Sequence, residues 1–411
     1  MNDETNYTTR RQFLAAAGFG ALAASAVGGG LAATARGGSA AKAGAALASA
    51  GAATRLGLVG TDGHIILPNR PNDQPVYIFG FIRVPADQTV ANLASQYRGK
   101  ARTPAPLLDF TAEQDVNIQL TNVGLPGRPD LIDSHTVHWH GFRTPLTVFD
   151  GVPEVSIAVP QSRQFTYFYR PHNPGTYMYH CHFEDVEHVQ MGMTGIVFVR
   201  PAGNPKWAYN DPTTAFDREF AILLNEIWTT VHDNDEQIQE TVETDYKPNY
   251  WVLNGRVYPQ TILGNDDPSL PQQPMSSLVQ VNEGEKMLLR LANLGYQQHA
   301  MQLPGIPLHV IGEDSTPLRN ASGADLSYWT NTIYIGPGEA RDVLFTAPAF
   351  SSARPVASDA VGPHNTYIFK NTNAWKLTNN GAPGLGGMMT EVRVYPAGSF
   401  PAYTGANQVV A

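Results

Sequence analysis

The stretch HCHFEDVEHVQMGM, from His180 to Met193, is the most informative part of this sequence. Within fourteen residues it holds the chain's only cysteine, three of its twelve histidines and two of its nine methionines. Imidazole, thiolate and thioether groups are ligands for transition metals such as copper. The stretch follows GTYMY, whose tyrosines alternate with smaller or apolar side chains as in a β-strand. We therefore predict a strand that leads directly into a set of metal ligands.

A second histidine cluster stands earlier in the chain, in the stretch SHTVHWHGF. Its histidines are His135, His138 and His140, and its other residues include several that favour β-structure. Side chains along a strand alternate between two faces with a period of two. His138 and His140 are therefore expected on one face, and His135 has the opposite parity.

The same alternation divides the ligands of the first stretch. His180 and His182 share one face, while Cys181 points the other way. Parity thus defines two ligand groups. The first group contains His135 and Cys181. The second group contains four histidines: His138, His140, His180 and His182.

The first group has the chemistry of a blue copper centre, which uses two imidazoles, one thiolate and a weak axial thioether. His135 and Cys181 need one more histidine and one methionine to complete it. The loop expected after the strand provides His188 and then Met193. Met191 is the competing candidate for the axial position, and we rank it second.

The second group offers four imidazoles on one face, which suits copper ions that bind oxygen species. Because Cys181 lies between His180 and His182 in the chain, the backbone forms a short covalent route for electrons between the two groups. This route explains why a chain with one cysteine places it between two histidines. Three isolated histidines are interpreted as ordinary hydrogen-bonded residues: His64, His172 and His232.

Composition limits the class of protein further. A chain of 411 residues is long enough for two domains, and 38 Gly with 31 Pro indicates many turns. The net charge of −9 argues against a nucleic-acid partner, because phosphate binding requires a basic surface. A single cysteine excludes an internal disulfide, so commitment of its thiolate to a metal is the better interpretation.

The N-terminal sequence predicts export. The stretch TTRRQFLAAAGFGALAASAVGGGLAATA contains paired arginines, an apolar run and a small-x-small cleavage pattern, so we expect a twin-arginine signal peptide over residues 1–35. Its many Gly and Ala residues make a stable membrane span a poor alternative. An Ala/Gly-rich tether is expected over residues 36–55. The mature protein would then be periplasmic or extracellular.

An internal repeat predicts two copies of one fold. The stretch EQDVNIQLTNVG, residues 113–124, recurs as EGEKMLLRLANLG, residues 283–295. Alternating strands punctuated by Gly and Pro favour an all-β protein with two Greek-key β-barrel domains. We place the first domain at 56–205 and the second at 215–400, with a polar, Pro-rich boundary at 200–217.

The order and spacing of the ligands resemble the copper-binding signatures of multicopper oxidases. The chain contains HxxHxHG. It later contains HCH, which is followed after five residues by a histidine and after four more by a methionine. The resemblance is strongest to the two-domain laccase-like group with type 1 copper in the first domain, and it covers roughly residues 56–397. It implies a cupredoxin-like fold for both domains and assembly as a homotrimer.

The resemblance also gives each ligand a role. The implied type 1 copper ligands are His135, Cys181, His188 and Met193. The implied contact of the type 2 copper is His138. The implied ligands of the type 3 pair are His140, His180 and His182. The five-residue segment FEDVE after HCH matches the two-domain group and also leans toward copper nitrite reductases.

The second domain departs from this pattern at the positions of the cluster ligands. Where HxxHxHG is expected, the chain reads HAMQLPG, so that Gln302 and Pro304 replace the two cluster histidines and only His299 remains. After Tyr367 it reads IFKNTNAW in place of a histidine-bearing strand. A complete trinuclear cluster in this family takes histidines from both of two facing domains. We therefore expect the second domain to be structural.

Three histidines of the second domain could compensate in part, although their spacing is not HxH: His299, His309 and His364. We predict an exported, copper-dependent oxidoreductase that takes electrons from a small-molecule donor at type 1 copper and delivers them to oxygen at the histidine face. A nitrite-reductase-like enzyme is the alternative, although HCH and Thr136 depart from its pattern. A non-catalytic copper or electron-transfer protein is the third hypothesis.

Overall fold

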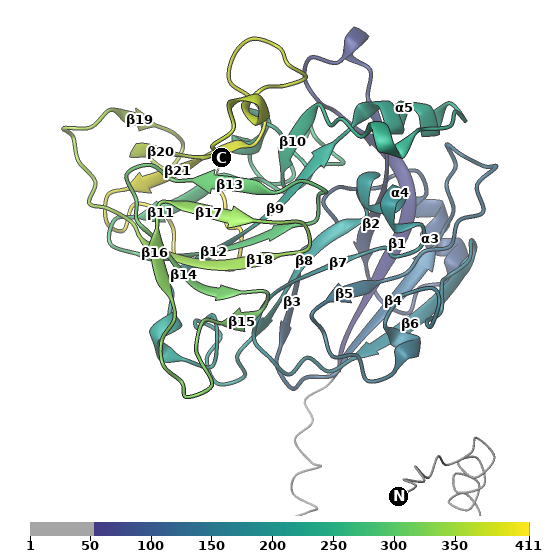
Figure 1. The fold of residues 1–411 in the computed structure, drawn as a ribbon, viewed down its shortest axis with the longest axis horizontal. Coiled ribbons are helices and arrows are strands. Elements are labelled where there is room, and N and C mark those ends of the chain that lie inside the picture. The colour runs from purple at the N-terminus through teal and green to yellow at the C-terminus, as the bar shows by residue number, and fades with distance from the viewer. Residues whose placement is uncertain (1–52, 411) are drawn as a thin grey trace, which may run out of the picture. The chain divides into compact units, whose positions relative to one another are not determined.

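The computed structural model of the chain describes residues 53–410. The predicted signal peptide and most of the predicted tether lie outside these residues. The described part consists mainly of β-strands joined by loops and short helices, which confirms the expected all-β fold class (Figure 1). The first strand begins at Thr54, two residues before the expected start of the first domain, and the Thr54 amide donates a hydrogen bond to Asp115 O at 2.8 Å.

The first barrel is built from two four-stranded sheets, in the orders β2-β1-β4-β6 and β3-β8-β7-β5. Its strands are β1 (Thr54–Ile65), β2 (Val76–Val84), β3 (Leu108–Thr111), β4 (Val116–Asn122), β5 (His138–His140), β6 (Arg163–Tyr169), β7 (Gly175–His180) and β8 (Thr194–Arg200). Its helices are α3 (Val90–Tyr97) and α4 (Asp185–Gln190), with short 3-10 turns η1 (Pro71–Asp73) and η2 (Thr147–Phe149).

The second barrel is built from two larger sheets, whose main paths are β10-β9-β12-β18-β14-β15 and β11-β21-β20-β13-β17. Its strands are β9 (Arg218–Ile227), β10 (Tyr250–Leu253), β11 (Val279–Asn282), β12 (Lys286–Asn293), β13 (His299–Gln302), β14 (Leu308–Glu313), β15 (Thr316–Pro317), β16 (Tyr328–Thr330), β17 (Thr332–Ile335), β18 (Ala340–Thr346), β19 (Val356–Ser358), β20 (Pro363–Asn371) and β21 (Met389–Tyr395). Its helical elements are α5 (Thr229–Glu236), η4 (Glu243–Asp245), η5 (Gln260–Ile262) and η6 (Ala374–Leu377), and η3 (Pro212–Thr214) precedes it.

The two barrels share one topology. In the first barrel β1 pairs in parallel with β4, and β3 pairs in parallel with β8. In the second barrel β9 pairs in parallel with β12, and β11 pairs in parallel with β21. Strands β4 and β12 are the two copies of the sequence repeat, so their matching positions agree with the duplication read from the sequence.

Strand β7 is buried on both faces, because each barrel covers one of them. Tyr177 and Tyr179 point into the core of the first barrel. Met178, with the opposite parity, packs in an apolar cluster with Ala221 and Leu223 of β9 in the second barrel. The strand that leads to Cys181 is therefore held between the two barrels, and Figure 1 shows β7 and β8 beside β12 and β18.

A buried polar network joins the barrels next to this strand. Arg290 of β12 is fully buried, and its Nε lies 2.9 Å from Glu219 Oε2. Arg290 Nη1 donates to Thr176 Oγ1 of β7 at 3.0 Å and lies 3.5 Å from Asp342 Oδ1. Thr176 in turn donates its hydroxyl to Asp342. Because the charges are out of water, each depends on its partners for compensation.

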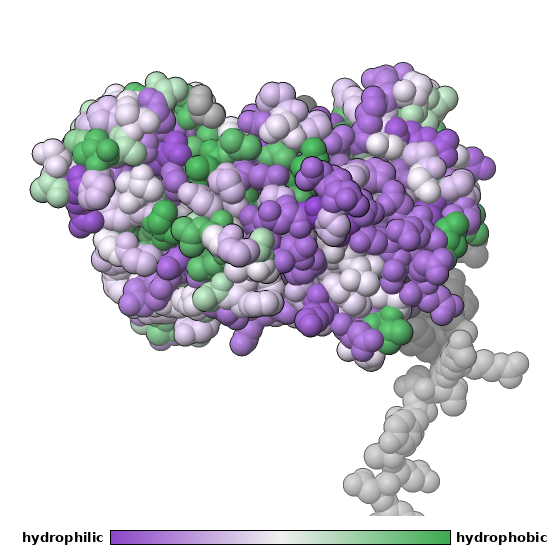
Figure 2. Space-filling view, turned by 90° about the horizontal axis from the view of Figure 1, so that it is seen from above, coloured by the Kyte–Doolittle hydropathy of each residue, from purple (hydrophilic) through white to green (hydrophobic). Residues whose placement is uncertain are grey.

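The surface is mixed in character. Figure 2 shows hydrophobic side chains in separate patches among hydrophilic ones on the face that it presents. Within residues 53–410 we find no helix with the length and apolar character needed to cross a membrane.

The buried network generates a stability prediction. Arg290→Met keeps the apolar stem but leaves Asp342 without its cation, while Glu219 retains Arg200. We expect a loss of roughly 3 kcal/mol in the free energy of unfolding, at the low end for a broken buried ion pair. Urea unfolding followed by circular dichroism measures it.

The matched control is Arg55→Met, whose partner Asp87 and own side chain are both more than half exposed. This variant should lose less than about 1 kcal/mol, because water screens the pair. Equal losses in the two variants would contradict the structural role given to Arg290.

Candidate copper centres

Three ligands of the first predicted group meet in the core of the first barrel. Cys181 Sγ lies 3.1 Å from His188 Nδ1 and 4.0 Å from His135 Nδ1. All three ligand atoms lie within 4.8 Å of one another, and all three residues are fully buried. The structure thus brings together residues that are far apart in the sequence.

The three residues come from different local structures. Cys181 follows the last residue of β7, and His135 forms an isolated β-bridge with Val159 instead of lying in a strand. His188 lies on α4, whereas the sequence analysis expected a loop at this position. Asp185 and Glu187 in the first turn of α4 stabilise the helix through its dipole.

The electrostatics of this group favour a thiolate with a cation beside it. Burial opposes a charged sulfur, but the attraction of His188 and hydrogen bonds from His135 and His188 hold the pKa of Cys181 well below its usual range. Burial also disfavours a charged ring, yet the Cys181 thiolate and Asp133 raise the pKa of His188 to about 10. A buried thiolate requires positive charge nearby, which a metal ion can supply.

Two further contacts orient these ligands. The Thr136 amide points at Cys181 Sγ at 3.4 Å, and hydrogen bonds to a ligand sulfur tune a copper–thiolate centre. Asp133 Oδ2 lies 3.7 Å from His188 Nε2, on the ring edge opposite Cys181. Carboxylates beside a ligating histidine fix its orientation. Asp133 was not among the residues predicted from the sequence, although it stands two residues before His135.

Both candidate axial methionines are fully buried in the same apolar cluster as Cys181. The Cys181 amide donates to Met193 O at 3.1 Å, and the Met193 amide donates to His188 O at 3.0 Å. Met191 O instead accepts from the Phe79 amide. The backbone of Met193 is therefore tied to two members of the ligand group, whereas that of Met191 is tied to β2.

The four histidines of the second group form one cluster on the outer face of the β5–β7 pair. His138 and His180 are direct partners across these strands. His140 Nε2 lies 3.0 Å from His180 Nε2, and ring nitrogens of His138, His140 and His180 all lie within 4.8 Å of one another. The His182 ring lies 4.9 Å from that of His138 and 5.4 Å from that of His180, between centroids.

Backbone carbonyls fix the orientation of two of these rings. His138 Nδ1 lies 2.6 Å from Asp150 O, and His180 Nδ1 lies 2.6 Å from Cys181 O. Because a carbonyl can only accept, each Nδ1 carries the proton and each Nε2 keeps its lone pair. The Nε2 lone pair is what a metal ion requires of a neutral imidazole.

Burial also keeps these rings neutral. It lowers the pKa of His138 and of His140, and it lowers the pKa of His180 to about 3. Neighbouring histidines lower the values further. At neutral pH these three rings are therefore uncharged imidazoles, the form that binds metals.

The second barrel borders the histidine cluster. A hollow of about 540 Å³ lies between His138 and His140 on one side and Asp314, Ser315 and Gly338 on the other. The His140 ring lies so close to Gly338 that a Cβ there would meet it at 3.5 Å. The cluster is therefore only partly covered within one chain.

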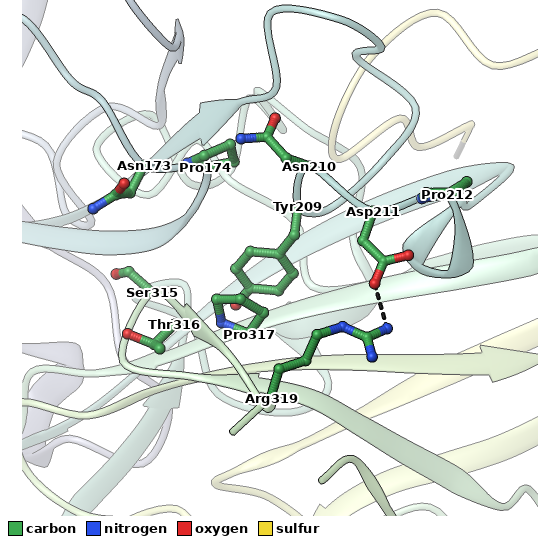
Figure 3. A pocket seen from close by; sticks show the side chains of 10 residues that line it. All are labelled: Asn173, Pro174, Tyr209, Asn210, Asp211, Pro212, Ser315, Thr316, Pro317 and Arg319. Carbon is green, nitrogen blue, oxygen red and sulfur yellow. Dashed lines mark hydrogen bonds and ion pairs between the residues drawn. The ribbon is translucent and has the colours of Figure 1, made fainter. Parts of the chain in front are cut away.

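A neighbouring hollow of about 470 Å³ shares Ser315 with the first (Figure 3). Its wall includes Tyr209 and the ion pair between Asp211 and Arg319. No histidine lines this hollow, and its charged groups already pair with each other. The histidine hollow, by contrast, is lined by two candidate metal ligands, His138 and His140.

The histidines of the second barrel lie in separate, hydrogen-bonded settings. His309 stacks on Trp329 and contacts Ser327 Oγ at 2.7 Å, and His364 Nδ1 lies 3.7 Å from Asp359. His299 is buried beside Glu226. The remaining isolated histidines also have hydrogen-bonding partners, as the sequence analysis expected: His64, His172 and His232.

Both donor sets match copper chemistry. Two imidazoles and a thiolate with buried thioethers beside them are the ligands of an electron-transfer copper, and convergent neutral imidazoles suit further copper ions. A protein of two β-barrels, the first of which carries both donor sets, belongs to the class of copper proteins.

Comparisons with known proteins agree with this class. Two family models described as multicopper oxidase match residues 94–204 and 218–374, which together make up more than half of the chain. The chain therefore belongs to the multicopper oxidase family. Copper is the cofactor that this membership implies, and the donor atoms described above fit it.

Plant laccases are among the similar sequences. Laccase-5 of Arabidopsis thaliana is 26% identical over 262 residues, which cover 61% of this chain and 41% of the laccase. Laccase-3 of Oryza sativa subsp. japonica is 26% identical over 242 residues, which cover 54% of this chain and 38% of that laccase. The chain thus spans about two fifths of the length of the curated relatives that it matches.

Solved structures share the fold. The blue copper oxidase from Nitrosomonas europaea has a TM-score of 0.61 at 23% identity, covering 83% of this chain and 86% of that one. A copper nitrite reductase from Nitrosomonas europaea has a TM-score of 0.55 at 15% identity, and the match covers 86% of this chain and 98% of the reductase. At these identities the likeness concerns the fold, and it supports two cupredoxin-like domains.

The close packing around His135 generates a prediction. A Cβ added at Gly60 of β1 would lie 2.6 Å from His135 Cδ2, so Gly60→Ala must displace the imidazole. We expect a loss of about 1–3 kcal/mol in the free energy of unfolding, together with altered visible absorption of the copper-loaded protein. Urea unfolding and absorption spectroscopy measure both.

Gly203→Ala is the control, because no atom lies within 4 Å of its added Cβ. It should leave both measurements unchanged. An unperturbed spectrum in Gly60→Ala would show that the His135 ring does not lie at the copper site.

Proposed function

We propose that this protein is a copper-dependent oxidoreductase that takes electrons from a small-molecule donor and passes them to an acceptor, oxygen, at the histidine cluster. The observation that carries the proposal is the position of Cys181. It belongs to the buried donor set, while its direct neighbours His180 and His182 belong to the histidine cluster. One stretch of backbone thus connects the two sets covalently.

In this proposal each donor set has a distinct role. Copper bound at the two sets would supply the one-electron redox chemistry. The type 1 ligands are His135, Cys181, His188 and Met193, with Met191 as the competing axial residue. The type 2 contact is His138, and the type 3 ligands are His140, His180 and His182. The hydrogen bonds from His138 and His180 to backbone carbonyls hold Nε2 ready for a metal.

The second domain is proposed to be structural. Gln302 pairs with Lys370 across β13 and β20, as His138 pairs with His180 across β5 and β7. Neither Gln302 nor Lys370 replaces imidazole as a copper ligand. We therefore propose that one chain holds type 1 copper and at most an incomplete histidine site, and that reduction of oxygen is slow or absent.

A nitrite-reductase-like activity is the second candidate, favoured by the five-residue segment FEDVE and by the smaller ligand set that such a site needs. The structure gives one observation against it. Thr136, where an acidic proton donor would be expected, accepts a hydrogen bond from the His182 amide at 2.8 Å. An aliphatic hydroxyl is also a far weaker acid than a carboxyl group, so Thr136 is a poor replacement for an acidic proton donor.

Export and assembly are further parts of the proposal. The paired arginines and apolar run of residues 1–35 support export by the twin-arginine route. The partly open histidine hollow would suit coverage by a neighbouring subunit, which keeps the homotrimer as a prediction. Metal analysis combined with electron paramagnetic resonance on the exported protein tests the copper assignments, because it separates type 1 copper alone from type 1 with type 2 copper and from a complete cluster.

The thiolate generates the sharpest prediction. Cys181→Ser removes the sulfur that gives a blue copper centre its intense absorption, so the colour and all oxidase activity should disappear. The fold should persist, because serine is of similar size. Visible absorption and circular dichroism measure the two effects. A blue Cys181→Ser protein would refute the type 1 assignment.

Met193→Leu provides the comparison within the same site. It should keep the blue colour and raise the reduction potential, because loss of a weak donor disfavours oxidised copper. If Met191→Leu raised the potential and Met193→Leu did not, the axial ligand would be Met191.

The histidine cluster generates a separate prediction. His140→Ala should lower the copper content while leaving the blue absorption intact, because His140 belongs only to the second donor set. His309→Ala in the second barrel should change neither quantity. Elemental analysis and visible absorption measure them. A chain with type 1 copper and a complete trinuclear cluster that loses copper in His309→Ala would show that the second domain supplies ligands.

A further inference from the structure

The core of the second barrel contains a residue cluster in the same structural position as the Cys181 group. His138 pairs with His180, so Val137 and Cys181 are opposite one another one step further along the strands. In the second barrel the equivalent pair is Met301 and Asn371. Asn371 therefore stands where the first barrel has its cysteine.

Two more equivalences follow. His299 precedes Met301 by two residues, as His135 precedes Val137. The backbone amide of Asn371 donates to Met388 O at 3.0 Å, as the backbone amide of Cys181 donates to Met193 O at 3.1 Å. Met388 thus takes the place of the proposed axial methionine.

Soft donor atoms converge on the Asn371 side chain. Its Nδ2 lies 3.2 Å from His299 Nδ1, 3.4 Å from Met388 Sδ and 3.7 Å from Met301 Sδ. All four side chains are buried. One imidazole and two thioethers around a single point are the ligands that soft monovalent cations such as Cu⁺ prefer.

A lysine supplies positive charge at the same place. Lys376 Nζ lies 3.3 Å from His299 Nδ1 and donates to Gln298 O at 2.9 Å, with only 9% of the residue exposed. His299 Nδ1 accepts from Lys376 and Asn371, so its proton lies on Nε2, which faces Glu226 Oε2 at 3.4 Å. Three buried side chains thus lie in a row that starts with a cation and ends with an anion: Lys376, His299 and Glu226.

We propose that the second barrel contains a closed metal site, in which the Lys376 ammonium and the Asn371 amide fill the position that a soft monovalent metal ion would take. The Lys376 ammonium supplies the positive charge that the ion would bring, and the Asn371 side chain occupies the space between the donor atoms. The proposal goes beyond the function proposed above and does not depend on it.

The test removes the two side chains that fill the site. It uses the full, copper-loaded chain, in which copper already occupies the donors of the first barrel. The probe is Ag⁺, a redox-inert soft ion, and the total metal per chain is counted after dialysis. Asn371→Ala combined with Lys376→Ala should bind one more metal ion than the parent protein. Adding Met388→Leu should lose that ion again, because a thioether donor is removed.

Two results would overturn the proposal. One is a folded double variant that binds no additional metal. The other is an additional ion that persists when Met388→Leu is added, since the ion would then lie elsewhere. Circular dichroism confirms that each variant is folded.

A pair of single variants decides the question if the double variant does not fold. Lys376→Met removes the cation that contacts His299 and adds a thioether, so Ag⁺ should raise the unfolding temperature of this variant. Lys376→Arg keeps the charge, so Ag⁺ should leave its unfolding temperature unchanged. Equal responses of the two variants to Ag⁺ would contradict the role given to Lys376.

Discussion

The buried sulfur of Cys181 is the constraint on which the rest of the first barrel depends. A thiolate with no exposure to water needs positive charge in contact with it, and His188 is held 3.1 Å away to provide that charge or share a metal. Because Cys181 follows β7 directly, its placement in the core sends His180 to the outer face. The two donor sets are thus consequences of one strand's alternation.

The second barrel supports this arrangement through packing. It covers the outer face of β7 with apolar side chains and contributes Arg290, whose guanidinium bonds to Thr176 near the start of the strand. Beyond this contact, Gly338 and Ser315 border the histidine hollow. The histidine face is therefore shaped by both barrels, although all four of its imidazoles come from the first.

The two barrels show how one core can hold either a metal site or its replacement. Equivalent positions carry Cys181 and Asn371, and both lie beside a histidine and a methionine. In the first barrel the sulfur carries negative charge, whereas in the second the amide is neutral and Lys376 brings the positive charge. In both cores a polar side chain at this position contacts a buried histidine, so the same fold accommodates different chemistry.

The sequence by itself determined the all-β class, the duplication and the division of the ligands into two groups, because strand alternation is a local property with a fixed period. Tertiary structure decided what depends on distant segments. It placed His188 on α4, brought Asp133 beside its ring, and set Asp150 O against His138. Lys376 is the clearest case. Nothing local distinguishes it from a surface lysine, and only the folding of η6 against β13 brings its ammonium to His299.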